Sequence, residues 1–246
     1  MKEFVLAEGW YWFIVMAVVS YLVGCFNFAL LISKLKHSDV RKIGSGNPGT
    51  MNMSRAFGLK VGAITLLCDL LKGGIPAIIS YFIFKQYYFA GTTVIVSDFT
   101  RYWCALFVIL GHIFPVTMHF KGGKGVGSTL GAFWLSLSCE EWWLCPVILL
   151  VGGAIVIGYI FWSEMGSAGS FLGITILTVI QSMFFYLRYS ECLSNPYVIA
   201  IFMLLFMFTV ITWAAHHQNI MRLFAGEEHR TSVRKLAKGK ASKEKV

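Results

Sequence analysis

Charged residues are scarce in this chain of 246 residues. Asp, Glu, Lys and Arg make up 13% of it, against 57% hydrophobic residues. A soluble globular domain carries about 25% charged residues, so the composition all but excludes a soluble enzyme. We interpret the chain as an integral membrane protein.

Acidic residues are the rarer charge, with 12 Asp and Glu against 21 Lys and Arg and a net charge of +9. The chain also lacks an HExxH motif and a Cys/His cluster, and its six cysteines form no CxxC pair. Nothing therefore indicates a zinc or redox site, and we expect neither a metal nor a cofactor. The positive charge is gathered in a few segments, which favours a membrane surface over nucleic acid.

Long apolar segments dominate what is present. A helix needs about 20 apolar residues to cross a bilayer. Seven segments are candidates, at residues 10–33, 58–84, 102–118, 126–138, 144–162, 167–187 and 196–215. The fourth is short and glycine-rich. We predict an all-α, polytopic fold with about seven transmembrane helices, in one membrane-embedded domain (1–228) followed by a basic tail (229–246).

Cationic residues indicate the orientation of these helices. With seven spans, the lysines and arginines of residues 34–60 and 121–124 share one side of the membrane with the basic tail. An even number of spans would separate the tail from the first loop. The positive-inside rule therefore predicts an outer N-terminus and a cytoplasmic C-terminus.

The first notable loop on the cytoplasmic side is GSGNPGT, residues 44–50. Its glycines allow positive φ angles, and successive backbone N–H groups in such turns form anion-binding concavities. Hydroxyl, amide and guanidinium groups nearby could add hydrogen bonds to a phosphate. The candidate ligands are Gly44, Ser45, Gly46, Asn47, Asn52 and Arg55. The alternative is a flexible connector, which is the commoner role of an isolated glycine loop.

A second loop, FKGGKGVGST at residues 120–129, has a similar character. The candidates are Lys121, Gly122, Gly123 and Lys124. The loop is not a Walker P-loop, because Gly125 stands where Ser or Thr is required, so ATP binding is not supported. Phosphate binding in general is supported. Lysines that only reach lipid headgroups are the alternative, but they would not need the surrounding glycines.

A third group lies at the end of the last apolar segment. His216, Asn219 and Arg222 recur every third residue, which places them on roughly one face of a helix. A histidine can act as base, acid or phosphate ligand, or simply cap a helix. Ser167 precedes the sixth segment and is either a helix cap or a further ligand. Asp69 and Lys72 lie within the second segment, where mutual pairing is the favoured role.

Together these motifs resemble one family. GSGNPGTMNMSR (44–55), GHIFPVTMHFKGGKGVGS (111–128) and HHQNIMRLFAGEE (216–228) are similar to the three cytoplasmic motifs of bacterial acyl-phosphate-dependent glycerol-3-phosphate acyltransferases of the PlsY type. CDLLKGGIP (68–76) matches as well. The chain departs from the family pattern at Phe26–Asn27 and at Glu164.

The resemblance implies a seven-helix protein of the bacterial plasma membrane with its active site facing the cytoplasm. It implies transfer of an acyl group from acyl phosphate to the 1-hydroxyl of glycerol 3-phosphate, with a possible link to a soluble enzyme that makes acyl phosphate. The carried-over residues are Ser45, Arg55, Lys121, Lys124, Ser167, His216 and Asn219. Ser45, His216 and Asn219 would be catalytic, and the proton acceptor would be either His216 or the substrate's own phosphate.

Acyl phosphate has a good leaving group, so its attack by an alcohol needs alignment and charge stabilisation more than a strong base. This agrees with the absence of the HxxxxD dyad of many lipid acyltransferases, since no histidine has an aspartate five positions later. A carrier of phosphorylated metabolites is the main alternative, because carriers also place broken helices and glycine turns around anions. A lipid-binding structural protein would explain the basic tail but not the glycine motifs.

Overall fold

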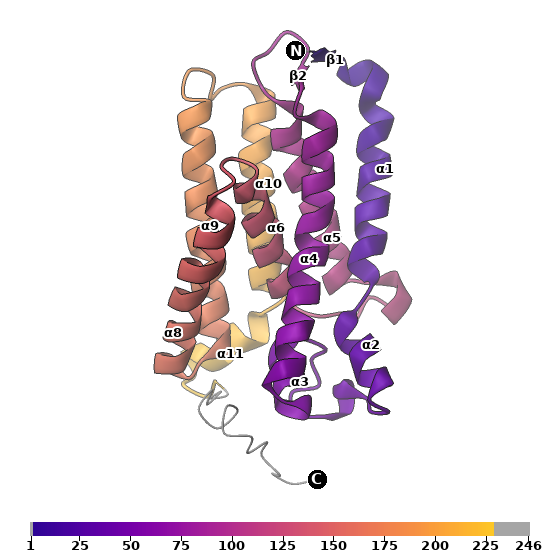
Figure 1. The fold of residues 1–246 in the computed structure, drawn as a ribbon, viewed down its shortest axis with the longest axis vertical. Coiled ribbons are helices and arrows are strands. Elements are labelled where there is room, and N and C mark those ends of the chain that lie inside the picture. Colours follow the sequence, from indigo (N-terminus) through magenta and orange to yellow (C-terminus); the bar gives the residue numbers. More distant parts are fainter. Residues whose placement is uncertain (1, 229–246) are drawn as a thin grey trace.

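The computed structural model describes residues 2–228, and the predicted tail (229–246) lies outside this range. Long helices run side by side to form a bundle, with two short strands at one end and short helices at the other (Figure 1). The long helices are α1 (Leu6–Cys25), α4 (Leu59–Phe84), α5 (Val96–Ile113), α6 (Val126–Ser138), α8 (Gly153–Ser163), α9 (Gly166–Arg188) and α10 (Pro196–Ala214). The all-α prediction is confirmed in this architecture.

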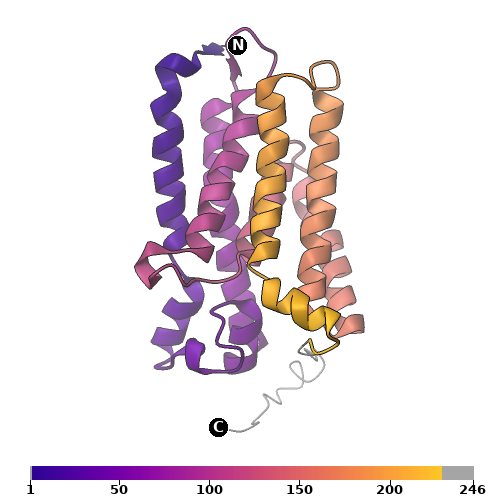
Figure 2. The same cartoon turned by 180° about the vertical axis from the view of Figure 1, so that it is seen from behind.

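Shorter elements complete the chain. They are α2 (Phe28–Leu35), α3 (Thr50–Phe57), α7 (Leu144–Val147), α11 (His217–Phe224), the 3-10 turns η1 (Val40–Lys42) and η2 (Val116–Met118), and the π-helical turn η3 (Ile148–Gly152). The strands β1 (Lys2–Phe4) and β2 (Tyr87–Phe89) pair in parallel. We call their end of the bundle the strand end, and the end that holds α2, α3 and α11 the site end (Figures 1 and 2).

Six helical segments within the described residues are long and apolar enough to cross a membrane. They are Leu6–Leu35, Leu59–Phe84, Val96–Met118, Leu144–Ser163, Gly166–Arg188 and Pro196–Ala214. The remaining predicted span corresponds to α6, whose 13 residues extend about 20 Å, less than the roughly 30 Å of a hydrocarbon core. The seventh crossing and the orientation of the termini therefore stay predictions.

The first apolar segment is found as a candidate span at Leu6–Leu35, but it is not one uninterrupted helix. Phe26 and Asn27 adopt extended backbone angles and divide it into α1 and α2. The Asn27 side chain caps α2 by accepting a hydrogen bond from the backbone N–H of Leu30. Lys72 on α4 donates to the carbonyl oxygens of Phe26, at 2.8 Å, and Gly24, at 3.4 Å. A helix break in an apolar environment requires such partners for its freed carbonyls.

The third predicted span also begins earlier than expected, at Val96 rather than residue 102. The added residues include Asp98 and Arg101, which lie outside the predicted span of 102–118. Both are buried: Arg101 is 0% exposed and donates to Asp98 at 2.5 Å and to Glu140 at 2.7 Å. Arg188 on α9 also pairs with Asp98, at 2.8 Å. This network joins α5, α9 and the end of α6.

Close helix packing holds α4 against α6. A Cβ atom on Gly73 would lie 2.0 Å from the carbonyl oxygen of Ser128, and one on Gly131 would lie 1.9 Å from that of Leu70. Glycine is therefore required at both positions for the backbones to approach this closely. The contact places the start of α6 beside the middle of α4, at residues 69–74.

Candidate active site

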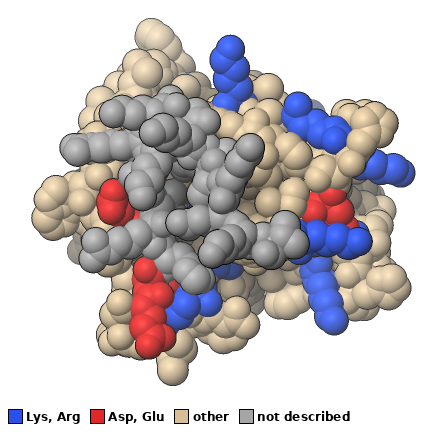
Figure 3. Space-filling model, turned by 90° about the horizontal axis from the view of Figure 1, so that it is seen from below, with Lys and Arg blue, Asp and Glu red and all other residues tan. Residues whose placement is uncertain are grey.

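The three sequence motifs meet at the site end. Several Lys and Arg side chains project from the described part of this face (Figure 3). At this end is a cavity of about 300 Å³ whose lining comes from the first loop, α3, α4, α5, the loop before α6, α6, α8, α9, α11 and Glu228. Its predicted members are Ser45, Asn47, Asn52, Arg55, Lys124, Ser167, His216 and Asn219. The structure thus brings together side chains that are up to 174 positions apart in the sequence (45 to 219).

The first loop owes its shape to Asn52. This buried side chain accepts a hydrogen bond from the backbone N–H of Ser45 and donates to the carbonyl oxygens of Val40 and Ile43. Gly44 and Gly46 have φ angles of 58° and 70°, as expected for turn positions, but they do not line the cavity. The loop therefore presents Ser45 and Asn47 to the cavity, while its glycines turn the chain.

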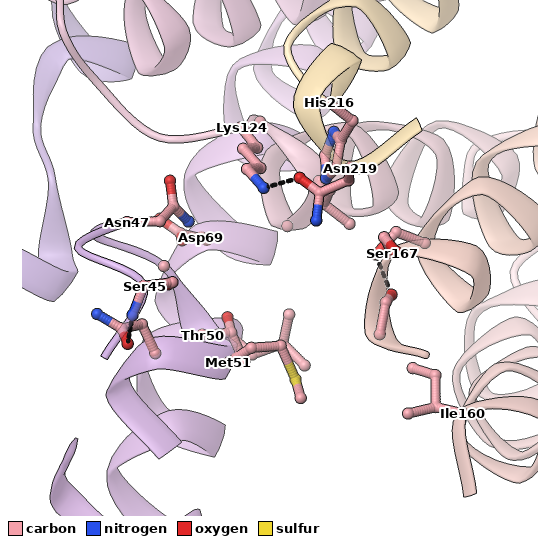
Figure 4. Close-up of a pocket in the computed structure, with 18 of the residues that line it drawn as sticks. Ser45, Asn47, Thr50, Met51, Asp69, Lys124, Ile160, Ser167, His216 and Asn219 are labelled. Atoms are coloured by element: carbon pink, nitrogen blue, oxygen red, sulfur yellow. Dashed lines mark hydrogen bonds between the residues drawn. The ribbon is translucent and has the colours of Figure 1, made fainter. Parts of the chain in front are cut away.

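Of the two lysines in the second loop, only Lys124 lines the cavity. Its Nζ donates to the side-chain oxygen of Asn219 (Figure 4). Lys121 is exposed and lies outside the cavity lining. Gly122 and Gly123 also lie outside it, because their N–H groups donate to the carbonyl oxygens at the end of α5, both at 3.0 Å. These two hydrogen bonds attach the second loop to the end of α5.

His216 is buried at the start of α11. Its Nδ1 lies 2.9 Å from the carbonyl oxygen of Thr212. Because a carbonyl can only accept, Nδ1 carries the proton, and Nε2 of the neutral ring keeps its lone pair. Burial, together with the positive charge of Lys124, lowers the pKa of His216 to about 4. The side chain is therefore a neutral hydrogen-bond acceptor at pH 7.

Glu228 is a site residue that sequence analysis included in the third motif without giving it a role. Its carboxylate accepts hydrogen bonds from Ser167 at 2.9 Å, Asn219 at 2.8 Å and Arg222 at 3.3 Å. Burial raises the pKa of Glu228, but these hydrogen bonds outweigh it and leave the pKa below its usual value. The carboxylate therefore links α9 to α11 and holds the side chains of Ser167, Asn219 and Arg222 in one arrangement. Its sequence spacing, nine positions beyond Asn219, gave no signal of this role.

The cavity carries more positive than negative charge. Arg55, Lys124 and Arg222 line it together with Glu228. Burial and the neighbouring charge of Arg222 lower the pKa of Lys124, and Arg55 adds to this effect while Glu228 opposes it. A bound anion would relieve the repulsion among these cations. Phosphate suits such a site, since guanidinium and ammonium groups form charge-assisted hydrogen bonds with it.

Asp69 and Lys72 connect the cavity to the helix break. Asp69 lines the cavity and forms an ion pair with Lys72 at 3.2 Å, which confirms the predicted pairing. Lys72 holds the carbonyls of the break, and Asn27 beyond it donates to the carbonyl oxygen of Pro48 at 3.5 Å. The departure from the family pattern at Phe26–Asn27 thus lies where the first helix is attached to the first loop.

The fold and the cavity define a helical membrane protein with a cavity at one end that is lined by cationic side chains. Residues 14–226 match the family model described as glycerol-3-phosphate acyltransferase. A protein of this name from Mycoplasmopsis pulmonis is 33% identical over 85% of this chain and 88% of its own length, and one from Ruthia magnifica is 35% identical over 89% and 96%. The chain belongs to the glycerol-3-phosphate acyltransferase family.

A solved structure supports the same assignment. It is that of PlsY, an integral membrane glycerol 3-phosphate acyltransferase, in its glycerol 3-phosphate form. The two chains share 27% identity with a TM-score of 0.69, over 92% of this chain and 98% of the other. A second structure of PlsY, in its lysophosphatidic acid form, matches with a TM-score of 0.67.

Proposed function

We propose that the protein transfers a fatty acyl group from acyl phosphate to the 1-hydroxyl of glycerol 3-phosphate, giving lysophosphatidate and inorganic phosphate for phospholipid synthesis. The observation that carries this proposal is the composition of the cavity. It combines a cationic end, with Arg55, Lys124 and Arg222, and an apolar wall from α4, α6 and α8. Both substrates carry a phosphate and one carries a hydrocarbon chain, so one cavity of this kind suits the pair.

In the proposed reaction, the 1-hydroxyl oxygen attacks the acyl carbon and a new ester bond forms. The bond between that carbon and the bridging phosphate oxygen breaks, and phosphate leaves with the electron pair. Arg55 and Lys124 bind the phosphates, while Ser45 and Asn219 orient the hydroxyl and the carbonyl. Preorganised donors of this kind stabilise the charge that develops in the transition state.

The hydroxyl proton has two possible acceptors within this scheme, His216 and a substrate phosphate. A pKa of about 4 makes His216 a weak base at neutral pH. A phosphate monoester has its second pKa near 6 and is the stronger base of the two. We therefore assign the proton to phosphate, and give the unprotonated Nε2 of His216 the role of accepting a hydrogen bond from a bound substrate.

The same proposal gives the protein its place in the cell. The positive-inside rule favours a site end that faces the cytoplasm of a bacterial plasma membrane. Acyl phosphate would then come from a soluble enzyme on that side.

The test is phosphate release by purified protein given acyl phosphate, with and without glycerol 3-phosphate. We expect release that depends on glycerol 3-phosphate, is matched by lysophosphatidate formation, and is lost in Arg55→Ala. Arg41→Ala is the control, because Arg41 is exposed and lies outside the cavity lining. If the protein turned over with acyl-CoA but not with acyl phosphate, the acyl donor in the proposal would be wrong and the transfer to glycerol 3-phosphate would stand. No turnover with either donor would contradict the proposal, and uptake of glycerol 3-phosphate into liposomes would then support the carrier.

A further inference from the structure

The cavity continues from its cationic end along an apolar wall. Six side chains without a polar atom line this part: Leu66, Val126, Leu130, Val156, Ile157 and Ile160. They come from α4, α6 and α8, and Ile160 is drawn below Ser167 in Figure 4. A wall of this composition suits a hydrocarbon chain, because moving methylene groups out of water into an apolar environment is favourable.

Two of these side chains meet over one glycine of α9. A Cβ atom on Gly173 would lie 3.0 Å from Cγ2 of Val156 and 3.5 Å from Cδ2 of Leu130. Val156 on α8 and Leu130 on α6 therefore converge on the same bare stretch of backbone. Val156 is seven residues from Ser163 at the end of α8, a distance of about 10 Å along the helix. The contact therefore lies along the bundle, away from the cationic end, and both side chains are half-buried there.

The position of α8 relative to α9 is fixed by a second glycine. A Cβ atom on Gly169 would lie 2.2 Å from Cγ1 of Ile160, so the two helices approach closely at this point. Gly169 and Gly173 are one turn apart, and Ile160 and Val156 are also one turn apart. The two contacts together hold α8 in one register against α9, so Val156 keeps its place at the inner end of the wall.

We propose that Leu130 and Val156, packed over Gly173, form a stop that sets the length of the acyl chain the enzyme accepts. This inference rests on the proposed acyl transfer. A chain that fills the wall up to the stop gains contact with every methylene, whereas a longer chain meets side chains held by α9. Discrimination by one methylene in an apolar pocket is about 10- to 200-fold at most.

The competing path leads out of the bundle. Ile157 also lines the cavity and is 62% exposed, so a chain could turn past it between α4 and α8 into the bilayer. A chain on that path would meet no stop, and substitutions at Val156 would leave its length preference unchanged. The two paths therefore predict different results for the same variants.

The experiment measures kcat/KM for saturated acyl phosphates of about 10 to 18 carbons, in steps of two methylenes. We expect Val156→Ala to move the optimum about two carbons longer and Val156→Phe to move it at least as far in the shorter direction, with roughly tenfold loss on the best chain of the wild type. Leu130→Ala is a second variant with the same expected direction as Val156→Ala. The KM for glycerol 3-phosphate should stay unchanged in all three.

Ile155→Ala and Ile155→Phe are the matched controls. Ile155 is on the same helix, 50% exposed and outside the cavity lining, so both changes should keep the wild-type profile. Equal profiles for the Val156 and Ile155 variants, beside an active wild type, would overturn the stop and leave the acyl transfer standing. If only acyl-CoA is used, the same series is run with acyl-CoA. An inactive wild type with every donor would refute the acyl transfer, and the stop with it.

Discussion

Both ends of the bundle hold buried charged side chains, but only at the strand end do the cations and carboxylates described here match in number. At the strand end, Arg101 and Arg188 face Asp98 and Glu140, so two cations meet two carboxylates. At the site end, three cations line the cavity with one carboxylate beyond the Asp69–Lys72 pair. Similar residue types therefore have different settings: the closed network joins helices, and under the proposed function the open one binds an anion.

The difference follows from where each network lies in the chain. The strand-end charges sit on α5, on α9 and just after α6, and Arg101 is completely enclosed by them. The site-end charges sit on short helices and a glycine-rich loop, which border a cavity. Burying a charge without a partner is costly. A site with surplus cations can persist only where its substrate or solvent supplies the missing negative charge.

The largest expected effect is at the open end. Lys124→Met should lower kcat/KM by about 100- to 1,000-fold, since it removes a charged donor aimed into the cavity. Lys121→Met is the matched control, because Lys121 is three residues away but exposed, and it should retain activity within about twofold of the wild type. Steady-state phosphate release measures both. Equal losses in the two variants would contradict the placement of the second loop.

The closed end should respond in stability instead. Arg101→Met leaves Asp98 and Glu140 without their central partner, which should cost about 3–5 kcal/mol of unfolding free energy. Arg188→Met should cost less, since its side chain is 34% exposed and water can replace it. Thermal unfolding in detergent compares the two. Activity per folded molecule should stay near wild type in both, unlike in Lys124→Met; a selective loss of catalysis would contradict the division between the ends.

Glu228 tests whether the open end needs its one carboxylate. Glu228→Gln keeps the shape of the side chain but weakens three charge-assisted hydrogen bonds, and should cost about 1.5–3 kcal/mol. Because the folded-state pKa is lowered, this stabilisation is present above the usual glutamate pKa and is lost as pH falls through the folded pKa. Thermal unfolding between about pH 7 and pH 3 should therefore converge for wild type and variant at the acid end. A constant difference across that range would contradict the assignment.

Sequence analysis predicted the open end better than the closed one. The three motifs carry glycines and cations at loop positions, which predicted a phosphate site, and the structure brings residues from all three motifs to one cavity. Sequence analysis could not tell which of Lys121 and Lys124 lines the cavity. That depends on the hydrogen bonds of Gly122 and Gly123 to α5, which sequence spacing does not show. It also left Arg101 outside the predicted span of 102–118, although the residue lies within α5, where a charge is costly unless it is paired. Only the tertiary structure supplies the carboxylates that offset that cost.

The smallest effect is expected at His216, and it addresses the proton. If phosphate accepts the proton, His216→Gln should lower kcat by no more than about tenfold, because Gln can also accept a hydrogen bond. The acid limb of the pH–rate profile should then stay near pH 6 in both proteins, where a phosphate monoester titrates. If His216 were the base, the wild type would instead show an acid limb near the pKa of His216, about 4. His216→Gln would lose that limb, and its kcat would be about 100- to 10,000-fold lower. Measuring kcat from about pH 3.5 to pH 8 separates these outcomes, since the two limbs lie about two pH units apart.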